Sequence, residues 1–297
     1  MKTARRFFHL ENESLGYLLV SVAALGFSTR SVITKLVYAY DVDPMTFLLM
    51  RLYIGVPLFL LALLIMEGRA GFVENAMGNL RGTLIGFVLG GSMFLTNEAI
   101  HALPASIATL VVYTYPAMTL LLVFAFTRKI AAMQIVAVGI TTLGLMLLLR
   151  IDRDDWIGLR GYGLMVGLAG ALCFATYSTL SDRMMRGISP LRMSTFSIVG
   201  SALAFAPIFG MREYPTAPEV WGLTAILAVF SGFCSFLSFM YGMRILGASR
   251  TTILSSVGPL FTLLWAFLLL GEVLDWLQLI GGATIIAGIL VLRLRKN

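Results

Sequence analysis

Residues 103–121 read LPASIATLVVYTYPAMTLL, and residues 246–264 read LGASRTTILSSVGPLFTLL. Aligned without a gap, the two stretches share more residues than a common apolar composition would supply. The identical pairs are Leu103/Leu246, Ala105/Ala248, Ser106/Ser249, Thr109/Thr252, Pro116/Pro259, Thr119/Thr262, Leu120/Leu263 and Leu121/Leu264. The chain therefore carries an internal repeat whose two copies lie 143 residues apart.

The composition indicates an integral membrane protein. Apolar residues make up 59% of the 297 residues and charged residues only 12%, too few to cover a water-soluble globule of this size. A bilayer core of about 30 Å needs roughly 20 mostly apolar residues per helical span. Ten runs meet this requirement and predict an all-α fold: 15–38, 44–66, 82–101, 104–127, 130–149, 159–181, 190–210, 219–243, 248–270 and 275–292.

The net charge of +7 arises mostly from cations on one side of these spans. With the N-terminus inside, the inner segments hold Lys2, Arg5, Arg6, Arg69, Arg81, Arg128, Lys129, Arg183, Arg186, Arg192, Arg244, Arg250, Arg293, Arg295 and Lys296. The outer loops hold only Arg150, Arg153, Arg160 and Arg212. Because cytoplasmic loops are enriched in Lys and Arg, both termini are expected in the cytoplasm, which requires an even number of spans. We expect no nucleic-acid partner.

The position of the repeat predicts its orientation. Five spans separate the two matching stretches, and an odd number reverses the direction of entry into the membrane. The fold expected is two inverted five-helix repeats, residues 1–150 and 151–297, related by a pseudo-two-fold axis in the membrane plane. Such halves suit alternating access. Pro116 and Pro259, within the repeated stretch, are candidate hinges because proline weakens a helix; a role in packing alone is the alternative.

The chain resembles an EamA-type member of the drug/metabolite transporter superfamily over essentially its whole length. The most specific segments are GFSTRSVITK (26–35), LPASIATLVVYTYP (103–116), ALCFATYSTLSDR (171–183) and GASRTTILSSVGPLFTLLWAFLLLGE (247–272). The aromatic residue usually found as Trp in the first and sixth spans is Phe27 and Phe174 here. The resemblance implies ten helices, cytoplasmic termini, a central cavity between the halves, and transport of amino acids, other small metabolites, nucleotide sugars or sugar phosphates.

Charged side chains within the spans are candidates for substrate recognition, because helices in lipid carry them mainly facing an interior or aqueous path. Arg30, Arg51 and Glu98 are expected at one depth in the outer half, and Glu98 is a candidate to pair with a cation or to titrate during transport. Lys35 and His101 lie at the same depth as candidates for an outer gate or ion pair. Structural ion pairs or snorkelling side chains are the alternative.

Polar side chains on apolar spans predict the rest of the cavity wall. In the eighth span, Ser231, Ser235, Ser238 and Tyr241 follow helical spacing and share one face. Packing or backbone bonding is the alternative role for such hydroxyls. Further candidates for substrate binding or translocation are Thr109 and Tyr113 in the fourth span, Thr176 and Tyr177 in the sixth, and Thr252 and Ser256 in the ninth.

These features predict a secondary transporter in the bacterial inner membrane that exports small metabolites, with amino acids or related amphipathic compounds as the leading substrates. The alternatives are a non-transporting scaffold or sensor, an intramembrane enzyme, and a channel. The sequence carries no metal-ligand cluster, phosphate-binding loop or nucleophile motif, so we expect no cofactor, no metal and no catalysis. Glycines in the fifth and tenth spans are expected to pack within one chain, which favours a monomer, and support of a dimer is the alternative: Gly139, Gly144, Gly281, Gly282 and Gly288.

Overall fold

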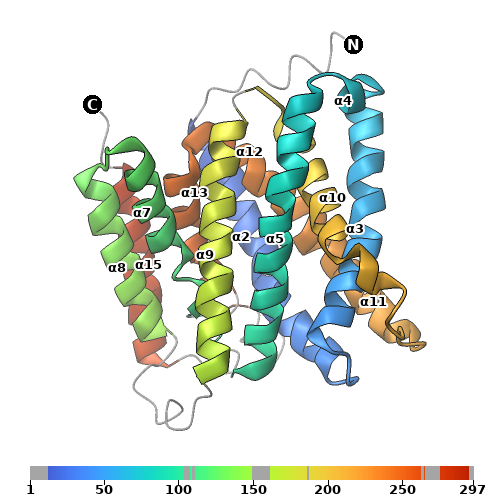
Figure 1. Ribbon diagram of the computed structural model, residues 1–297. Helices are drawn as coiled ribbons and strands as arrows, with labels where there is room; N and C mark the ends of the chain where they lie inside the picture. The colour runs from blue at the N-terminus through green and yellow to red at the C-terminus, as the bar shows by residue number, and fades with distance from the viewer. Residues whose placement is uncertain are drawn as a thin grey trace.

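The computed structural model describes residues 13–103, 108, 111–148, 161–185, 187–261, 264 and 275–293, and within these ranges the chain is helical without β-strands. Figure 1 shows the helices packed side by side as one bundle. Their bounds are α2 Glu13–Tyr38, α3 Pro44–Glu67, α4 Ala70–Val73, α5 Ala76–Ala102, α7 Tyr115–Thr127, α8 Ala132–Leu148, α9 Gly161–Met184, α10 Pro190–Phe209, α11 Pro218–Leu227, the π-helix η2 Ala228–Ser235, α12 Phe236–Leu246, α13 Ala248–Leu254, the 3-10 helix η3 Ser255–Val257 and α15 Trp276–Arg293.

Six helices are long and apolar enough to cross a membrane. They are α2, α3, α5, α9, α10 and the continuous helix Pro218–Leu246, which joins α11, η2 and α12. This confirms the all-helical, multi-pass architecture. Shorter apolar helices, Tyr115–Thr127, Ala132–Leu148 and Trp276–Val291, lie within the expected spans 104–127, 130–149 and 275–292. The total of ten spans therefore stays a prediction.

The second and seventh expected spans begin in the same way. Asp43 caps α3, with its carboxylate accepting hydrogen bonds from the amides of Met45 and Thr46, and Pro44 occupies the first turn. Ser189 caps α10, followed by Pro190. Both arrangements satisfy amide groups that a helix start leaves unpaired, and proline fits the first turn because it has no amide hydrogen to place.

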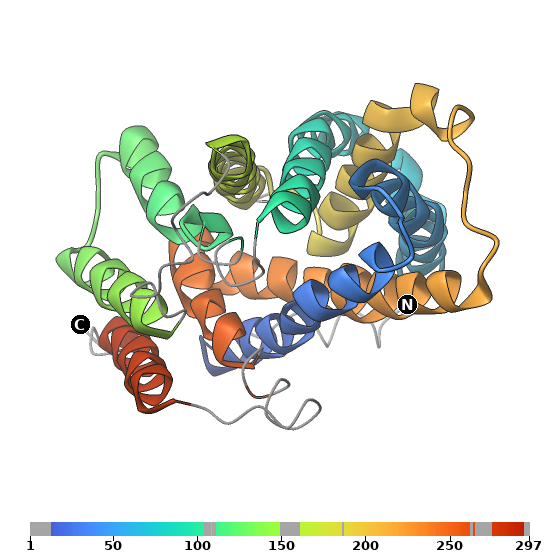
Figure 2. The same ribbon diagram turned by 90° about the horizontal axis from the view of Figure 1, so that it is seen from below.

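Helices at matching places in the two halves run in opposite directions. In Figure 1, α2 descends from the end of the bundle where α4 lies, whereas α9 ascends toward that end; α3 and α10 are likewise opposed. The view in Figure 2 places α8 and α15 side by side at one edge of the bundle. The central helices of one half pack directly on those of the other, since the hydroxyl of Ser92 on α5 donates to the carbonyl of Gly170 on α9 at 2.9 Å.

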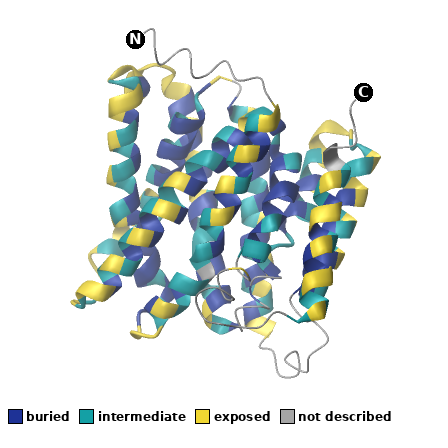
Figure 3. Ribbon diagram, turned by 180° about the vertical axis from the view of Figure 1, so that it is seen from behind, coloured by how far each residue is buried: buried dark blue, intermediate teal, exposed yellow. Residues whose placement is uncertain are grey.

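One apolar core is shared by both halves. It includes Phe59 from α3, Leu89 from α5, Tyr177 from α9, and Phe239 and Met243 from α12. The outer faces are also apolar, and Figure 3 shows exposed residues along the outside of most helices. Large exposed side chains on these faces include Leu61, Ile65, Leu121, Met165, Leu203 and Leu279. Apolar surfaces of this extent are rare on water-soluble monomers and suit contact with lipid.

Glycine allows the closest helix contacts. A Cβ on Gly144 would lie 2.8 Å from the carbonyl oxygen of Gly281, and a Cβ on Gly288 would lie 2.7 Å from the Thr141 side chain, so α8 and α15 pack within one chain as expected. Gly282 packs against Leu260, whereas Gly139 has no such neighbour within 4 Å. Small residues let helix backbones approach closely in lipid.

Candidate functional site

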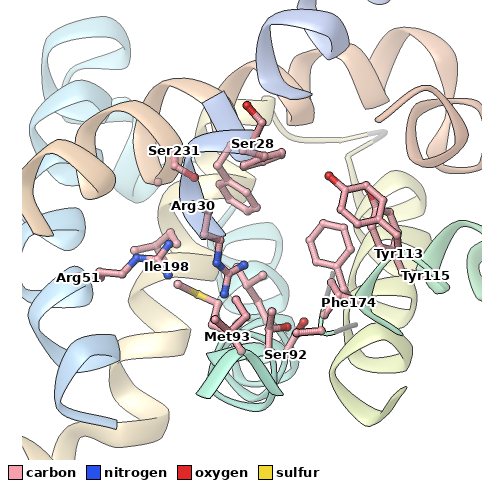
Figure 4. Close-up of a pocket in the computed structure, with 18 residues that line it drawn as sticks. Ser28, Arg30, Arg51, Ser92, Met93, Tyr113, Tyr115, Phe174, Ile198 and Ser231 are labelled. Atoms are coloured by element: carbon pink, nitrogen blue, oxygen red, sulfur yellow. The ribbon is translucent and has the colours of Figure 1, made fainter. Parts of the chain in front are cut away.

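A cavity of about 150 Å³ lies between the two halves. Figure 4 shows side chains from several helices converging on it. Its lining comprises Phe27, Ser28, Arg30, Arg51, Leu89, Ser92, Met93, Thr96, Ile100, Ala108, Val112, Tyr113, Tyr115, Phe174, Ile198, Ser231, Gly232 and Phe236. A cavity of this size holds an apolar group about as large as a benzene ring.

Two broken helices meet at this cavity. A turn at Tyr113 and Thr114 separates the helical residues 111–112 from α7, and the 3-10 helix η3 separates α13 from the helical residues 258–261. These breaks occupy the same place in the repeat, because residues 113–114 align with residues 256–257. Each break lies just before the proline predicted to be a hinge. Pro116 is thus in the first turn of α7 rather than in the middle of a helix.

Side chains join the two breaks directly. The hydroxyls of Tyr115 and Ser255 are 2.5 Å apart. Ser255 donates its own hydrogen to the carbonyl of Thr252 at 2.7 Å, so Tyr115 is the donor to Ser255. Beside this bond, a Cβ built on Gly258 would lie 2.2 Å from the hydroxyl oxygen of Tyr113. Glycine at position 258 therefore makes room for Tyr113.

Arg30 and Arg51, both predicted as candidates for the site, bring positive charge into the cavity. Arg30 donates from Nη2 to the side-chain oxygen of Asn97 at 3.0 Å. Arg51 is only 7% exposed, and its guanidinium carbon lies 5.7 Å from the ring centre of Phe47. Nε of Arg30 and both Nε and Nη1 of Arg51 are buried without a hydrogen-bond partner. No acidic residue from the described ranges lines the cavity.

Glu98 does not take the position expected for it. Its carboxylate accepts a hydrogen bond from Tyr162 at 3.1 Å, and it is absent from the cavity lining. Among the described residues, the ion pairs include none between Glu98 and a cation of the first two spans. One residue advances a helix by about 100°, so Asn97 rather than Glu98 faces Arg30. The expected pairing of Glu98 with Arg30 or Arg51 is therefore not found.

Lys35 and His101 lie beyond the cavity toward the ends of α2 and α5. The ammonium of Lys35 donates to the carbonyl of Leu103 at 3.4 Å. His101 is exposed, and its ring meets the ring of Tyr38 edge to face with centroids 5.4 Å apart. Tyr38 also donates to the carbonyl of Asn97 at 3.2 Å. These contacts tie α2 to α5 at the end where both helices finish, and neither predicted residue forms an ion pair with a described carboxylate.

The predicted stripe of Ser231, Ser235, Ser238 and Tyr241 is not continuous in the structure. Of the four, Ser231 lines the cavity. The helix changes to a π-helix over Ala228–Ser235, and the Ser235 hydroxyl donates to the carbonyl five residues earlier, at Phe230. A π-helix takes one more residue per hydrogen-bonded turn than an α-helix. The faces of η2 and α12 are therefore out of register, and Ser238 and Tyr241 do not line the cavity.

Four other predicted residues lie around the cavity rather than in its wall. Tyr177 is fully buried behind Phe236, with its ring stacked on that ring at 6.0 Å. The hydroxyls of Thr176 and Thr252 donate to carbonyls of their own helices, 2.8 and 3.0 Å away. Ser256 is buried in η3. Thr109 lies outside the described residues. Arg30, Arg51, Tyr113 and Ser231 are thus the predicted residues that line the cavity.

Several lining residues were missed in the sequence. Ser92 and Thr96 of α5 lie four residues apart and share a face, a helical spacing that is visible in the span 82–101. For Phe27 and Phe174, the sequence indicated only a departure from Trp. Both line the cavity, and both rings contact Phe239, with centroids 5.9 and 5.7 Å away.

A polar cluster joins the two halves at the end of the bundle far from the cavity. The carboxylate of Glu67 accepts hydrogen bonds from Ser189 and from Nε of Arg192. Arg192 also donates to the Glu74 carbonyl at 2.9 Å. Arg51 precedes Glu67 by 16 residues on α3, roughly 24 Å along the helix axis. We call Glu67, Glu74, Ser189 and Arg192 the α3–α10 cluster.

Other reactive groups do not form a second site in the described part of the chain. Cys173 and Cys234 are free thiols. In the same part of the chain, no three His, Cys, Asp or Glu side chains are grouped closely enough to hold a metal ion.

Comparison with known proteins shows that one family model matches both halves of the chain. The family model described as the EamA-like transporter family matches residues 14–150 and again residues 161–294. Over 293 residues the chain is 25% identical to an uncharacterized transporter, YcbK, of Bacillus subtilis, covering 92% of this chain and 90% of that protein. It is 26% identical over 211 residues to an uncharacterized transporter of Archaeoglobus fulgidus, covering 70% of this chain and 75% of the relative.

A solved crystal structure shares the fold. It superposes with a TM-score of 0.78 at 20% sequence identity, covering 96% of this chain and 100% of the other.

Proposed function

The chain belongs to the EamA-like transporter family, and from this premise we propose that it is a secondary transporter that moves a small metabolite by alternating access. It is a multi-pass integral membrane protein, with six helices able to span a bilayer by length and composition. Its similarity to proteins named as transporters favours transport over catalysis.

The observation that carries the proposal is the cavity between the halves. Residues of both halves line it. The broken helix of the first half contributes Tyr113 and Tyr115 to the lining, and Tyr115 is hydrogen-bonded to Ser255 in the broken helix of the second half. Binding sites in secondary transporters commonly lie between internal repeats, next to interrupted helices. A solute bound here would contact both halves, so their relative movement would change the side from which it is reached.

We propose that the two halves are inverted repeats of five spans each, ten in all, with both termini in the cytoplasm. The opposed directions of α2 and α9 and of α3 and α10 support this arrangement. In this orientation the α3–α10 cluster lies at the cytoplasmic end, and the cavity lies nearer the outer end. The structure then represents a state closed toward the cytoplasm, and breaking the cluster is part of opening inward.

The proposed cargo is a small amphipathic metabolite, of which amino acids and related compounds are the leading class, and the proposed direction is export across a bacterial inner membrane by a monomer. Aromatic rings and hydroxyls share the lining, which suits an amphipathic solute better than a naked ion. A non-transporting scaffold or sensor is the second candidate; it predicts solute binding without flux.

The test is transport by the purified chain in liposomes. Vesicles loaded with a panel of unlabelled metabolites are diluted into the same labelled compound, so that exchange through the protein accumulates label inside. Accumulation above that of protein-free liposomes, with and without an imposed pH gradient, is the expected result. If no compound that binds the purified protein exchanges across the membrane, the transporter proposal is wrong and the sensor is favoured.

A further inference from the structure

From the charge in the cavity we infer that the chain binds a small organic anion, specifically a carboxylate on an apolar or aromatic body and without a free ammonium group. The inference rests on the proposed function and deepens it: the cargo remains a small amphipathic metabolite, but carboxylic acids related to amino acids replace the zwitterionic amino acids as its leading class. It starts from Arg30 and Arg51, which line one cavity of about 150 Å³.

The described residues compensate the charge of these two arginines poorly. Arg51 is 7% exposed, and its Nε and Nη1 groups have no hydrogen-bond partner. Arg30 has one described partner, the neutral side-chain oxygen of Asn97, and its Nε is also unpartnered. A buried, unpaired charge is strongly unfavourable, and two like charges in one cavity repel each other. An anion bound between them would relieve both effects.

Guanidinium geometry favours an oxyanion. The planar guanidinium group presents N–H donors in a fork that matches the two oxygens of a carboxylate. Three of the lining hydroxyls already donate within the protein: Ser28 to the Leu25 carbonyl at 2.5 Å, Ser92 to the Gly170 carbonyl at 2.9 Å, and Tyr115 to the Ser255 hydroxyl. The arginine N–H groups are the charged donors among the described lining residues, and hydrogen bonds from charged donors to a carboxylate are the stronger ones.

The same lining disfavours a free ammonium group. An ammonium in a membrane protein needs a carboxylate or several carbonyl oxygens, and no Asp or Glu from the described ranges lines the cavity. The nearest acidic residue along α5, Glu98, is turned away and accepts from Tyr162. A zwitterionic amino acid would place its cation beside two guanidinium groups, whereas the corresponding carboxylic acid would not.

The rest of the cavity suits an apolar body. Figure 4 shows Arg51 on the opposite side of the cavity from Tyr113 and Tyr115, with Arg30 between them. Phe174 packs its ring against Tyr115, with centroids 5.0 Å apart and planes at 81°. An anion held by the arginines would therefore direct its body toward this aromatic wall, where apolar burial and ring contacts stabilise it.

A matched set of compounds tests the inference on the purified, detergent-solubilised full chain. The set keeps one body and varies the charge: 3-phenylpropanoate, L-phenylalanine, 2-phenylethylamine, 3-phenylpropanamide and 2-phenylethyl phosphate. Straight-chain carboxylates from butanoate to octanoate vary the body. We expect 3-phenylpropanoate or a straight-chain carboxylate to raise the thermal unfolding temperature with saturation, and the amide and amine to have no effect.

Variants connect the effect to the arginines. For Arg51→Gln and for Arg30→Gln, we expect carboxylate affinity to fall about tenfold or more, since a hydrogen bond to a charged group contributes about 1.5–3 kcal/mol and 1.4 kcal/mol is tenfold. The unliganded Arg51→Gln protein should unfold at the same or a higher temperature than the wild type, because an uncompensated charge has been removed. Arg250→Gln, which removes an ion pair with Glu13, is the control and should bind normally.

The outcomes separate this inference from the transporter proposal. Carboxylate binding that depends on Arg30 and Arg51, without exchange in liposomes, would support the anion site and contradict transport. Stabilisation by L-phenylalanine or the amine equal to or greater than that by the ammonium-free carboxylates would overturn the inference, as would binding of the phosphate ester alone or no stabilisation by any ammonium-free carboxylate. A lower unfolding temperature for unliganded Arg51→Gln, with carboxylate binding unchanged, would assign Arg51 a structural role and overturn its assignment to the site.

Discussion

The hydroxyl of Tyr115 donates a hydrogen bond to the hydroxyl of Ser255 across the boundary between the two halves, with 2.5 Å between the oxygens. Each residue sits where its own half breaks a helix. Because the bond is buried and joins segments that align in the internal repeat, it links the interrupted helix that lines the cavity through Tyr113 and Tyr115 to the interrupted helix of the other half. If the two halves rearrange during transport, a bond that is present in only one conformation stabilises that conformation.

Tyr115→Phe is expected to alter the rate of solute exchange by up to about fivefold, with normal membrane insertion. A buried hydrogen bond contributes about 1 kcal/mol, and a bond present in only one conformation shifts the balance of conformations by that amount. Exchange rates in liposomes give the measurement. If the effect arises from this bond, Ser255→Ala and the double variant should match the single variant; additive effects would show that the two hydroxyls act separately.

Gly258→Ala is expected to impair both stability and exchange, because its methyl group would lie 2.2 Å from the Tyr113 hydroxyl oxygen. Overpacking of this kind typically destabilises by about 1–3 kcal/mol. Thermal unfolding in detergent measures the loss. Adding Tyr113→Phe should restore stability, since the next nearest atom, Cζ of Tyr113, is 3.3 Å away. Gly222→Ala, at a position with open space, is the control; equal losses at both glycines would rule out the steric explanation.

The sequence predicts the helical fold better than it predicts which residues line the cavity. Long apolar runs identify the six helices able to span the membrane, because the requirement for about 20 apolar residues is set by the bilayer rather than by tertiary packing. Pro44 and Pro190 mark helix starts for an equally local reason, the absence of an amide hydrogen.

Which side chains face the cavity depends on the rotation of each helix about its own axis, and residue spacing in the sequence predicts that rotation only approximately. Glu98 was the obvious charged candidate on α5, yet its neighbour Asn97 meets Arg30. The serine stripe fails after Ser231 because η2 is a π-helix, and no residue pattern in the stripe signalled that change of period. The sequence did identify Arg30 and Arg51, because charged side chains within membrane spans are mostly functional. It identified Tyr113 because this residue is a polar side chain within the repeated stretch.

Arg192→Gln is expected to loosen the end of the bundle closed by the α3–α10 cluster, because Glu67 and Glu74 lose their cation. A reporter cysteine at Met243, fully buried in the shared core, should react with a thiol reagent at least about fivefold faster in this variant. The background replaces Cys173 and Cys234 with Ser. Arg250→Gln, which removes an exposed ion pair with Glu13, is the control and should leave the labelling rate unchanged. If Arg192→Gln does not accelerate labelling, the α3–α10 cluster does not hold this end of the bundle closed.

Asp43 is expected to make a pH-dependent contribution to stability. Burial raises the pKa of its carboxyl, but hydrogen bonds from Thr46, the charge of Arg212 and a bond from Met45 outweigh burial, so the pKa is lowered overall. A group with a depressed pKa stabilises the fold above its unfolded pKa, about 3.9, and loses this contribution as pH falls through the folded value.

Asp43→Ala should therefore lower the free energy of unfolding by about 1 kcal/mol at pH 7, the usual contribution of a helix cap. The difference from the wild type should shrink as the pH is lowered below about 4. Chemical unfolding in detergent across this range is the measurement. Glu213→Ala, an exposed change next to Arg212 in the loop between α10 and α11, is the control. A difference that stays constant down to the lowest pH would show that ionisation of Asp43 has no part in its effect.

The central claim is that one cavity is reached from each side of the membrane in turn. Thr96, which lines the cavity and is buried, can be replaced with Cys in a chain lacking Cys173 and Cys234. In vesicles of known orientation, a membrane-impermeant thiol reagent applied from either side should label this cysteine, and a cysteine at Thr224, buried outside the lining, should stay unlabelled. Labelling from only one side under every condition of solute and pH would contradict alternating access.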